Sequence, residues 1–389
     1  MKTWKYALSA LATAALLAGC GGGGGATSSN SLGFTSIVSF GDSLSDAGTH
    51  AVGTVAALKG GRYTINSGDL AKPSKIWLDH ITAQYGLPAP CSAETGINSR
   101  SPFGAPVASA KAATCRNYAV GGARVTQAIG PAHPALPDSA GGAVGQLDTP
   151  VVTQIANHLG VVGSFSGREL VTVLAGGNDI FMNGAAVGAA AGGGAGAAGA
   201  ATIAGWSAAD IATVTAGGAA AQGAAAQAAV VAMGTAGAQL AGYIKASIVG
   251  KGAKYVLVMN LGDLGSTPYG IENPTAIPLV AAMTKAYNDQ LTAGLAGVAG
   301  VMVADVNTVT KDQFANPAAY GISNIKNRAC DTSAAKNPLG GASLACNPLN
   351  VIAGDVSKYQ FADDVHPTPY GHQLLAQFAA KVLASAGWL

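Results

Sequence analysis

The sequence predicts an α/β fold in which helices cover a parallel β-sheet. Short apolar segments recur along the chain, and they are nearly continuous rather than alternating, as in strands that are buried on both faces. Segments with apolar residues at helical spacing lie between them. Strand–helix alternation of this kind is typical of layered α/β domains with a parallel sheet.

The strands are predicted from composition, and the helices from periodicity and end signals. Four apolar segments are predicted strands: residues 34–40, 169–175, 255–261 and 300–306. Thr149-Pro150 resembles an N-cap and first turn, Gly250 is a plausible C-cap, and two more helices are expected around residues 279–291 and 374–383. Residues 184–205 form a low-complexity Ala/Gly tract, which we expect to be an insertion that specifies no packed core.

The composition excludes two broad classes of protein. The 389 residues are 49% hydrophobic and only 10% charged, which excludes a disordered chain. The 21 basic residues include Lys2 and Lys5, which lie in a segment expected to be removed, and the rest equal the 19 acidic residues in number. A neutral chain lacks the basic surface that nucleic acids require, so no nucleic-acid partner is expected.

The N-terminus has the pattern of an export signal. A basic start precedes an apolar run at residues 7–19, which is too short to cross a bilayer as a helix. The sequence Leu-Ala-Gly-Cys20 resembles a bacterial lipobox, which implies an acylated Cys20 and an outer-membrane lipoprotein held to the membrane by this lipid. The alternative is an ordinary secretory signal and a secreted protein. We expect a lipoprotein signal peptide at 1–19, a flexible tether at 20–33 and one catalytic domain at 34–389.

The remaining cysteines fit an oxidising compartment. Apart from Cys20 there are four, which allow three pairings. We expect Cys91–Cys115 and Cys330–Cys346, because each pair closes a short loop. Neither Cys-x-x-Cys nor His-Glu-x-x-His spacing occurs, so no metal site and no cofactor are expected.

Two segments at opposite ends of the chain carry the residues of a nucleophilic site. The strand at 34–40 runs into Gly-Asp-Ser43-Leu, which would present Ser43 at the carboxyl edge of the sheet. In Asp363-Asp364-Val-His366, Asp363 can hold one imidazole nitrogen while the other faces the serine. Asp364 is a rival carboxylate, but consecutive side chains diverge, and the spacing favours Asp363. Each segment alone is more often a turn or a helix cap.

Two glycine-containing segments lie between these ends. Residues 117–123 contain Gly121-Gly122, whose bare backbone N–H groups can donate to a developing oxyanion. Gly-Gly-Asn178-Asp179 directly follows the predicted strand at 169–175, so the Asn178 amide can be a second donor at the same edge. Either segment alone is more often a simple turn.

Together, and in this order, the four segments resemble the conserved blocks of the GDSL lipases and esterases, the SGNH hydrolases. Segments at 61–63, 77–78 and 316–321 are also similar, so the resemblance covers most of the chain from Ser36 to about Ala380. It implies a three-layer α/β/α sandwich that is flavodoxin-like, with a central parallel sheet of five strands.

The resemblance also implies a serine esterase or lipase that hydrolyses carboxylic esters, including lipid esters, through an acyl-enzyme. Residue by residue, it implies that Ser43 is the nucleophile and also the first oxyanion donor. Gly122 (with Gly121 as the fallback) and Asn178 are the implied further donors. His366 is the implied general base, and Asp363 is the carboxylate that orients it. The alternatives are an acyltransferase on the same scaffold and a catalytically silent surface-binding lipoprotein.

Overall fold

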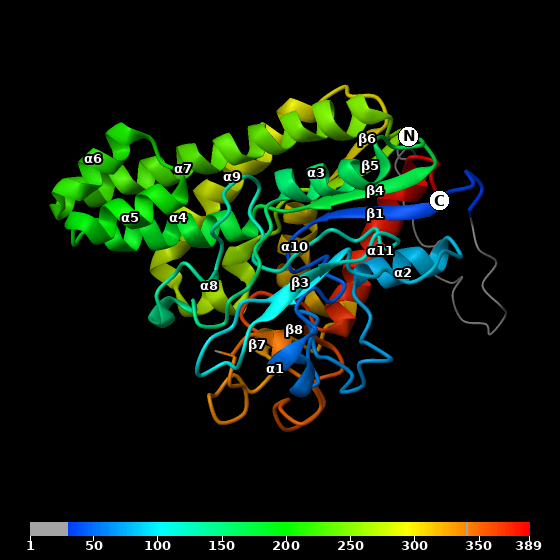
Figure 1. The fold of residues 1–389 in the computed structure, drawn as a ribbon, viewed down its shortest axis with the longest axis horizontal. Coiled ribbons are helices and arrows are strands. Elements are labelled where there is room, and N and C mark those ends of the chain that lie inside the picture. The colour runs from blue at the N-terminus through cyan, green and yellow to red at the C-terminus, as the bar shows by residue number, and fades with distance from the viewer. Residues whose placement is uncertain (1–29, 340) are drawn as a thin grey trace, which may run out of the picture.

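The computed structural model describes residues 30–339 and 341–389, and its centre is a parallel β-sheet (Figure 1). The sheet has the order β1-β4-β5-β6, and all its neighbouring strands are parallel. Its strands confirm the four predicted from the sequence: β1 (Ser36–Gly41), β4 (Glu169–Leu174), β5 (Tyr255–Met259) and β6 (Val301–Ala304). Cys20 and the predicted signal peptide lie outside the described residues.

A fifth segment lies beside β1 without forming a full strand. Ser39 N–H donates to Arg116 O at 3.0 Å, and Tyr118 N–H donates to Ser39 O at 2.8 Å. The only ladder position is a parallel bridge between Ser39 and Asn117, so the described sheet has four strands rather than the five implied by the resemblance. The segment follows β1 to its end, where Val120 N–H donates to Gly41 O at 3.1 Å.

Helices cover both faces of the sheet, giving a three-layer α/β/α sandwich (Figure 1). Helices α3, α7 and α9 pack on the face that contains Val171 and Val256. Helices α2, α10 and α11 pack on the face that contains Leu170 and Leu257. Alternate residues of the same strands therefore enter opposite cores. The covering helices are α3 (Val151–Val162), α7 (Gly218–Tyr243), α9 (Ile277–Leu295), α2 (Trp77–Gln84), α10 (Val306–Ala315) and α11 (Pro369–Ser385).

Smaller elements surround the carboxyl edge of the sheet. They are the helices α1 (Gly53–Ala57) and α8 (Pro268–Glu272), the antiparallel pair β2 (Glu94–Ile97) and β3 (Val107–Lys111), and the parallel pair β7 (Asn324–Arg328) and β8 (Tyr359–Phe361). Disulfides join Cys91 to Cys115 and Cys330 to Cys346, which confirms the expected pairing.

Two predicted helix ends differ from the structure. The N-cap of α3 is Pro150 rather than Thr149, whose hydroxyl instead donates to Glu94 at 3.2 Å. After α7 the chain continues through a π-turn and a 3₁₀-turn and reverses at Gly252, not at Gly250. Gly252 has a φ of 105°, a conformation that favours glycine.

The Ala/Gly tract is helical and packed, so the expectation that it specifies no core is wrong. It falls in α4 (Gly177–Ala190) and α5 (Gly194–Ala204), which form an arm with α6 (Ala208–Ala216) and α7 (Figure 1). Alanine has the highest helix propensity, and its small side chain lets helices approach closely. The buried tract residues are Ala186, Ala190, Ala197, Ala201 and Ala204.

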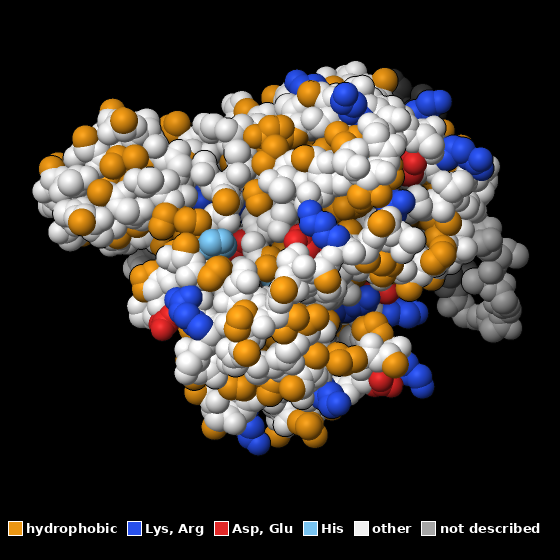
Figure 2. All heavy atoms as spheres, in the orientation of Figure 1, with side chains coloured by type: hydrophobic (Ala, Val, Ile, Leu, Met, Phe, Trp, Pro, Cys, Tyr) orange, Lys and Arg blue, Asp and Glu red, His pale blue; other side chains and the backbone are white. Residues whose placement is uncertain are grey.

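The arm carries very few charged side chains. In Figure 2 its visible surface is white and orange, whereas lysine and arginine side chains lie over the rest of the molecule. The helical stretch Gly218–Lys251 is long and apolar enough to cross a membrane by length and composition alone. In this structure its inner face is instead buried, and Met233 and Leu240 contribute to the core that α9 also joins.

The closest approach of α7 and α9 generates a stability prediction. A Cβ atom on Gly237 would lie 2.3 Å from the Tyr287 carbonyl oxygen, whereas a Cβ on Gly242 would meet nothing within 4 Å. Gly237→Ala should destabilise the fold by about 1–3 kcal/mol, because the helices must move apart. Gly242→Ala should stabilise it by about 0.5–1 kcal/mol through helix propensity. Urea unfolding of both variants checks this; equal effects would contradict the packing described.

Candidate active site

The turn after β1 presents Ser43 at the carboxyl edge of the sheet. Gly41 ends the strand, and a Cβ there would lie 2.1 Å from the Leu174 carbonyl oxygen, so only glycine fits. Asp42 is buried, and its Oδ1 accepts a hydrogen bond from Leu44 N–H at 3.1 Å. Burial raises the pKa of Asp42 to about 7. The turn is therefore held by backbone packing and by a carboxyl group next to Ser43.

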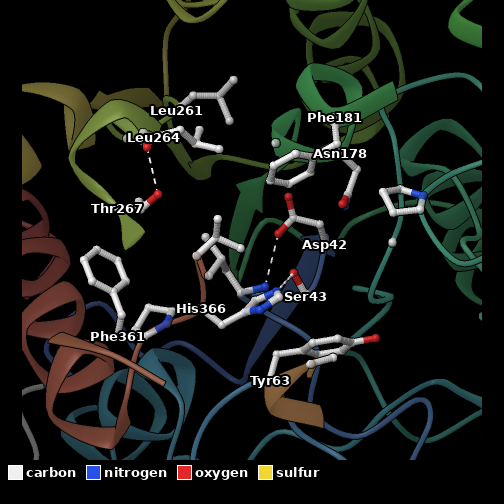
Figure 3. Close-up of a pocket in the computed structure, with 18 of the residues that line it drawn as sticks. Asp42, Ser43, Tyr63, Asn178, Phe181, Leu261, Leu264, Thr267, Phe361 and His366 are labelled. Carbon is white, nitrogen blue, oxygen red and sulfur yellow. Dashed lines mark hydrogen bonds between the residues drawn. The ribbon is translucent and has the colours of Figure 1, made fainter. Parts of the chain in front are cut away.

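The two ends of the chain meet at this turn. His366 Nε2 lies 2.8 Å from Ser43 Oγ, and His366 Nδ1 lies 2.7 Å from Asp363 Oδ2 (Figure 3 shows the first contact). Asp363 also accepts hydrogen bonds from the backbone N–H groups of His366 at 2.8 Å and Ser343 at 2.6 Å. Ser343 lies in the loop closed by Cys330–Cys346, so this disulfide loop supports the carboxylate.

The electrostatics of the pair favour a charged carboxylate beside a basic imidazole. Burial alone would raise the pKa of Asp363, but the charge of His366, its hydrogen bond and two backbone N–H groups hold that pKa well below its usual range. Burial lowers the pKa of His366, but the Asp363 carboxylate outweighs it and raises the pKa above its usual value. This arrangement suits a base that accepts a proton from a neighbouring hydroxyl.

Asp364 has a different partner. Its carboxylate pairs with Arg328, which also pairs with Glu272 at 2.5 Å. This charged cluster joins α8, β7 and the loop of His366 at a partly exposed position. The structure therefore brings Asp363, and not its neighbour, to the imidazole.

The site has three potential hydrogen-bond donors for an oxyanion, and one of them is the backbone N–H of Ser43 itself. Within the described chain, the backbone N–H groups of Ser43 and Gly122 have no protein acceptor, whereas Gly121 N–H donates to Asp46 at 2.8 Å. Gly121, the fallback donor, is therefore already engaged. Asn178 donates one amide hydrogen to Ala123 O at 2.9 Å and lines the cavity beside Ser43 (Figure 3). The site thus contains the donors that an oxyanion needs.

Gln154, which the sequence did not single out, and Tyr63, from the similar segment at 61–63, hold this arrangement. Gln154 on α3 donates to Gly41 O and accepts from Gly41 N–H, both at 2.8 Å, and so clamps the end of β1. The Tyr63 ring lies 4.9 Å from the His366 ring, centroid to centroid. Gln154 occupies the buried face of α3 with Val151 and Ile155. A polar residue within an apolar helical stripe is the sequence signal that indicates such a role for Gln154.

A buried ion pair joins the two donor segments. Arg124 Nε lies 2.8 Å from Asp179 Oδ1, and the second carboxylate oxygen accepts Val125 N–H at 3.0 Å. Arg124 also donates to the carbonyl oxygens of Ile203 and Ala204 at the end of α5. The arm and both donor segments are therefore connected through one guanidinium group.

A cavity of about 650 Å³ extends from Ser43. Its polar groups include Asn178 and His366, and most of its other walls are apolar. The apolar lining comes from several elements and includes Leu44, Phe181, Leu261, Leu264, Val306, Val309, Leu344, Phe361, Leu375 and Phe378. Over residues 30–339 and 341–389, no group of three or more His, Cys, Asp or Glu side chains is placed to hold a metal ion.

The buried ion pair generates a second stability prediction. Arg124→Met should cost about 3–5 kcal/mol of unfolding free energy, because Asp179 is then left charged and buried without its partner. Lys285→Met is the matched control, since Lys285 forms an exposed pair with Asp289 and should change little. Urea unfolding measures both; an Arg124→Met variant as stable as the control would refute the structural role of this pair.

Comparison with known proteins agrees with this geometry. The family model described as GDSL-like Lipase/Acylhydrolase matches residues 37–379. Esterase EstA of Pseudomonas aeruginosa is 34% identical over 140 residues, which are 35% of this chain and 20% of that protein. Esterase EstA of Pseudomonas putida matches with the same figures. A GDSL esterase/lipase of Arabidopsis thaliana is 32% identical over 83 residues, 21% of this chain and 22% of the relative.

These matches show the family, although the chain spans only about a fifth of the length of these curated relatives. The family match covers the Ser43 turn, the segments of Gly122 and Asn178 and the His366 loop. The chain belongs to the GDSL-like lipase/acylhydrolase family.

Proposed function

We propose that the chain is a serine esterase in which Ser43 attacks a carboxylic ester and forms an acyl-enzyme. One observation carries the proposal: Ser43 and His366, 323 positions apart, lie within hydrogen-bond distance of each other. His366 Nε2 would take the hydroxyl proton as the serine oxygen attacks the carbonyl carbon. Asp363 would stabilise the imidazolium that forms.

The remaining steps use the same groups. The N–H groups of Ser43 and Gly122 and the side chain of Asn178 would donate to the tetrahedral oxygen. Loss of one such donor is expected to lower kcat by about 10²–10³-fold. His366 would then protonate the leaving alcohol. In the second half, His366 would deprotonate the water that attacks the acyl carbonyl, and would give this proton to the Ser43 oxygen as the acid leaves. Each proton removed is thus returned, and the enzyme ends unchanged.

The cavity supports an apolar acyl group in the substrate. A volume of about 650 Å³ falls in the usual range for small-molecule sites, and apolar walls favour a hydrocarbon chain. Aliphatic and aromatic side chains such as Leu264 and Phe361 line the same cavity as His366 (Figure 3). We therefore place the acyl part of the ester in this cavity and its carbonyl oxygen toward Gly122 and Asn178.

Replacement of the nucleophile tests the proposal directly. Ser43→Ala should lower kcat for p-nitrophenyl butyrate at least about 10⁴-fold, because no acyl-enzyme can form. Ser385→Ala is the control, since Ser385 is exposed near the end of α11, bonds the Val382 carbonyl oxygen and does not line the cavity. Circular dichroism should show both variants folded. Ester turnover retained by folded Ser43→Ala would rule out this nucleophile.

The two neighbouring aspartates give a second test. Asp363→Asn should lower kcat about 10³–10⁴-fold, whereas Asp364→Asn should change kcat far less because Asp364 pairs with Arg328.

The pH dependence of the rate tests the same assignment. In the wild type, activity should fall as the pH drops below the raised pKa of His366, since the base must be neutral. Loss of the Asp363 charge lowers that pKa, so the acid limb of kcat/KM should move to lower pH. The opposite ranking of the two variants would assign the orienting role to Asp364.

A further inference from the structure

Asp148 is a buried carboxyl group that the proposed reaction does not use. Its side chain is 0% exposed, and neither carboxyl oxygen has a hydrogen-bond partner in the described part of the chain. Its backbone has a φ of 48°, in the left-handed region that few residues other than glycine adopt. Buried, unpartnered and strained groups of this kind are typical of functional sites rather than of ordinary cores.

Asp148 packs directly against the second oxyanion donor. A Cβ atom on Gly122 would lie 1.7 Å from Asp148 Oδ1, so the carboxyl group occupies the space that any side chain there would need. A Cβ on Gly130 would lie 3.0 Å from Asp148 Oδ2, which places the carboxyl between two glycines. The carboxyl therefore forms the back wall of the loop that presents Gly122 N–H to the cavity.

The surroundings of Asp148 favour its neutral form. Burial raises its pKa well above the usual value. The nearby Gly130 N–H, which lies outside hydrogen-bond geometry, and the Arg124 charge lower the pKa by less. Arg124 is already paired with Asp179. Other titratable groups nearby include the buried Tyr63 and the buried Asp46, which accepts Gly121 N–H at 2.8 Å. His50 also lies nearby, and its Nε2 accepts a hydrogen bond from Leu147 N–H. Burial lowers the pKa of His50, so it supplies no positive charge at neutral pH.

We propose that Asp148 is a positioning residue whose buried, uncharged carboxyl group fixes the Gly122 loop, and that a negative charge on it impairs the oxyanion site. The inference rests on the proposed esterase function. A carboxylate in contact with Gly122 would repel the negative charge that develops on the substrate oxygen. It would also draw the loop out of place, because a buried charge without a partner recruits donors or water.

Asp148→Asn tests the proposal, because the amide keeps the shape and stays neutral at every pH. Rates are measured with p-nitrophenyl butyrate from pH 6 to pH 10, corrected for spontaneous hydrolysis. The ratio of kcat at pH 10 to kcat at pH 7 should be at least about threefold higher in Asp148→Asn than in the wild type. Asp289→Asn, on the exposed face of α9, is the control and should keep the wild-type profile.

Thermal stability supplies a readout that does not depend on activity. A pKa that is raised in the folded state stabilises the fold below the unfolded pKa, and this stabilisation is lost as the pH rises. The asparagine variant suffers no such loss, so its Tm should exceed the wild-type Tm by about 2–6 °C at pH 8 and by less at pH 4.5. If Asp148 were instead ionised and only structural in role, Asp148→Asn should have a lower Tm than the wild type at pH 8.

The outcomes separate this inference from the proposed function. Absence of ester turnover in the wild type would refute the esterase proposal itself. Wild-type turnover with the same alkaline decline in Asp148→Asn and Asp289→Asn would overturn only the role of Asp148. A Tm of Asp148→Asn below the wild-type value at pH 8 would likewise overturn it. Asp148→Ala, which removes the wall, should lower kcat at pH 7 in folded protein, and asparagine should restore it.

Discussion

The hydrogen bond between Ser43 and His366 is the contact on which the whole site depends. It joins the turn after the first strand to the loop before the last helix, and its atoms are 2.8 Å apart. Neither residue has special chemistry alone, because a serine hydroxyl is a weak nucleophile and an exposed histidine is an unoriented base. Asp363 fixes the imidazole from behind, and the loop closed by Cys330–Cys346 fixes Asp363 through Ser343 N–H.

Buried polar side chains position the donors around this contact. Asp46 accepts hydrogen bonds from the N–H groups of Gly48, Thr49 and Gly121, and so holds the turn after Ser43 against the glycine loop. Gln154 clamps the end of β1, and Arg124 with Asp179 connects the glycine loop to α4. A site preorganised in this way needs little rearrangement as charge develops.

Local patterns explain why part of the molecule could be predicted from sequence. The four strands are continuous apolar runs, and Ser43, Asn178 and His366 follow a strand or precede a helix, so short segments sufficed. The packed helices of the Ala/Gly tract cannot be predicted in this way, because low complexity hides helix propensity and burial of Ala197 or Ala201 depends on tertiary packing. Asp148 carries no local signal at all. Its importance comes from contact with Gly122, which only the folded chain creates.

Covalent labelling with an ester-like phosphonate measures the central contact most directly. A p-nitrophenyl alkylphosphonate reacts with a serine only where a base takes the proton and donors hold the phosphoryl oxygen. Peptide mass spectrometry of the labelled protein should place a single adduct on Ser43, with release of one equivalent of p-nitrophenol, and His366→Ala should abolish it. An unlabelled Ser43 in the folded wild-type protein, or an adduct on another residue, would contradict the account.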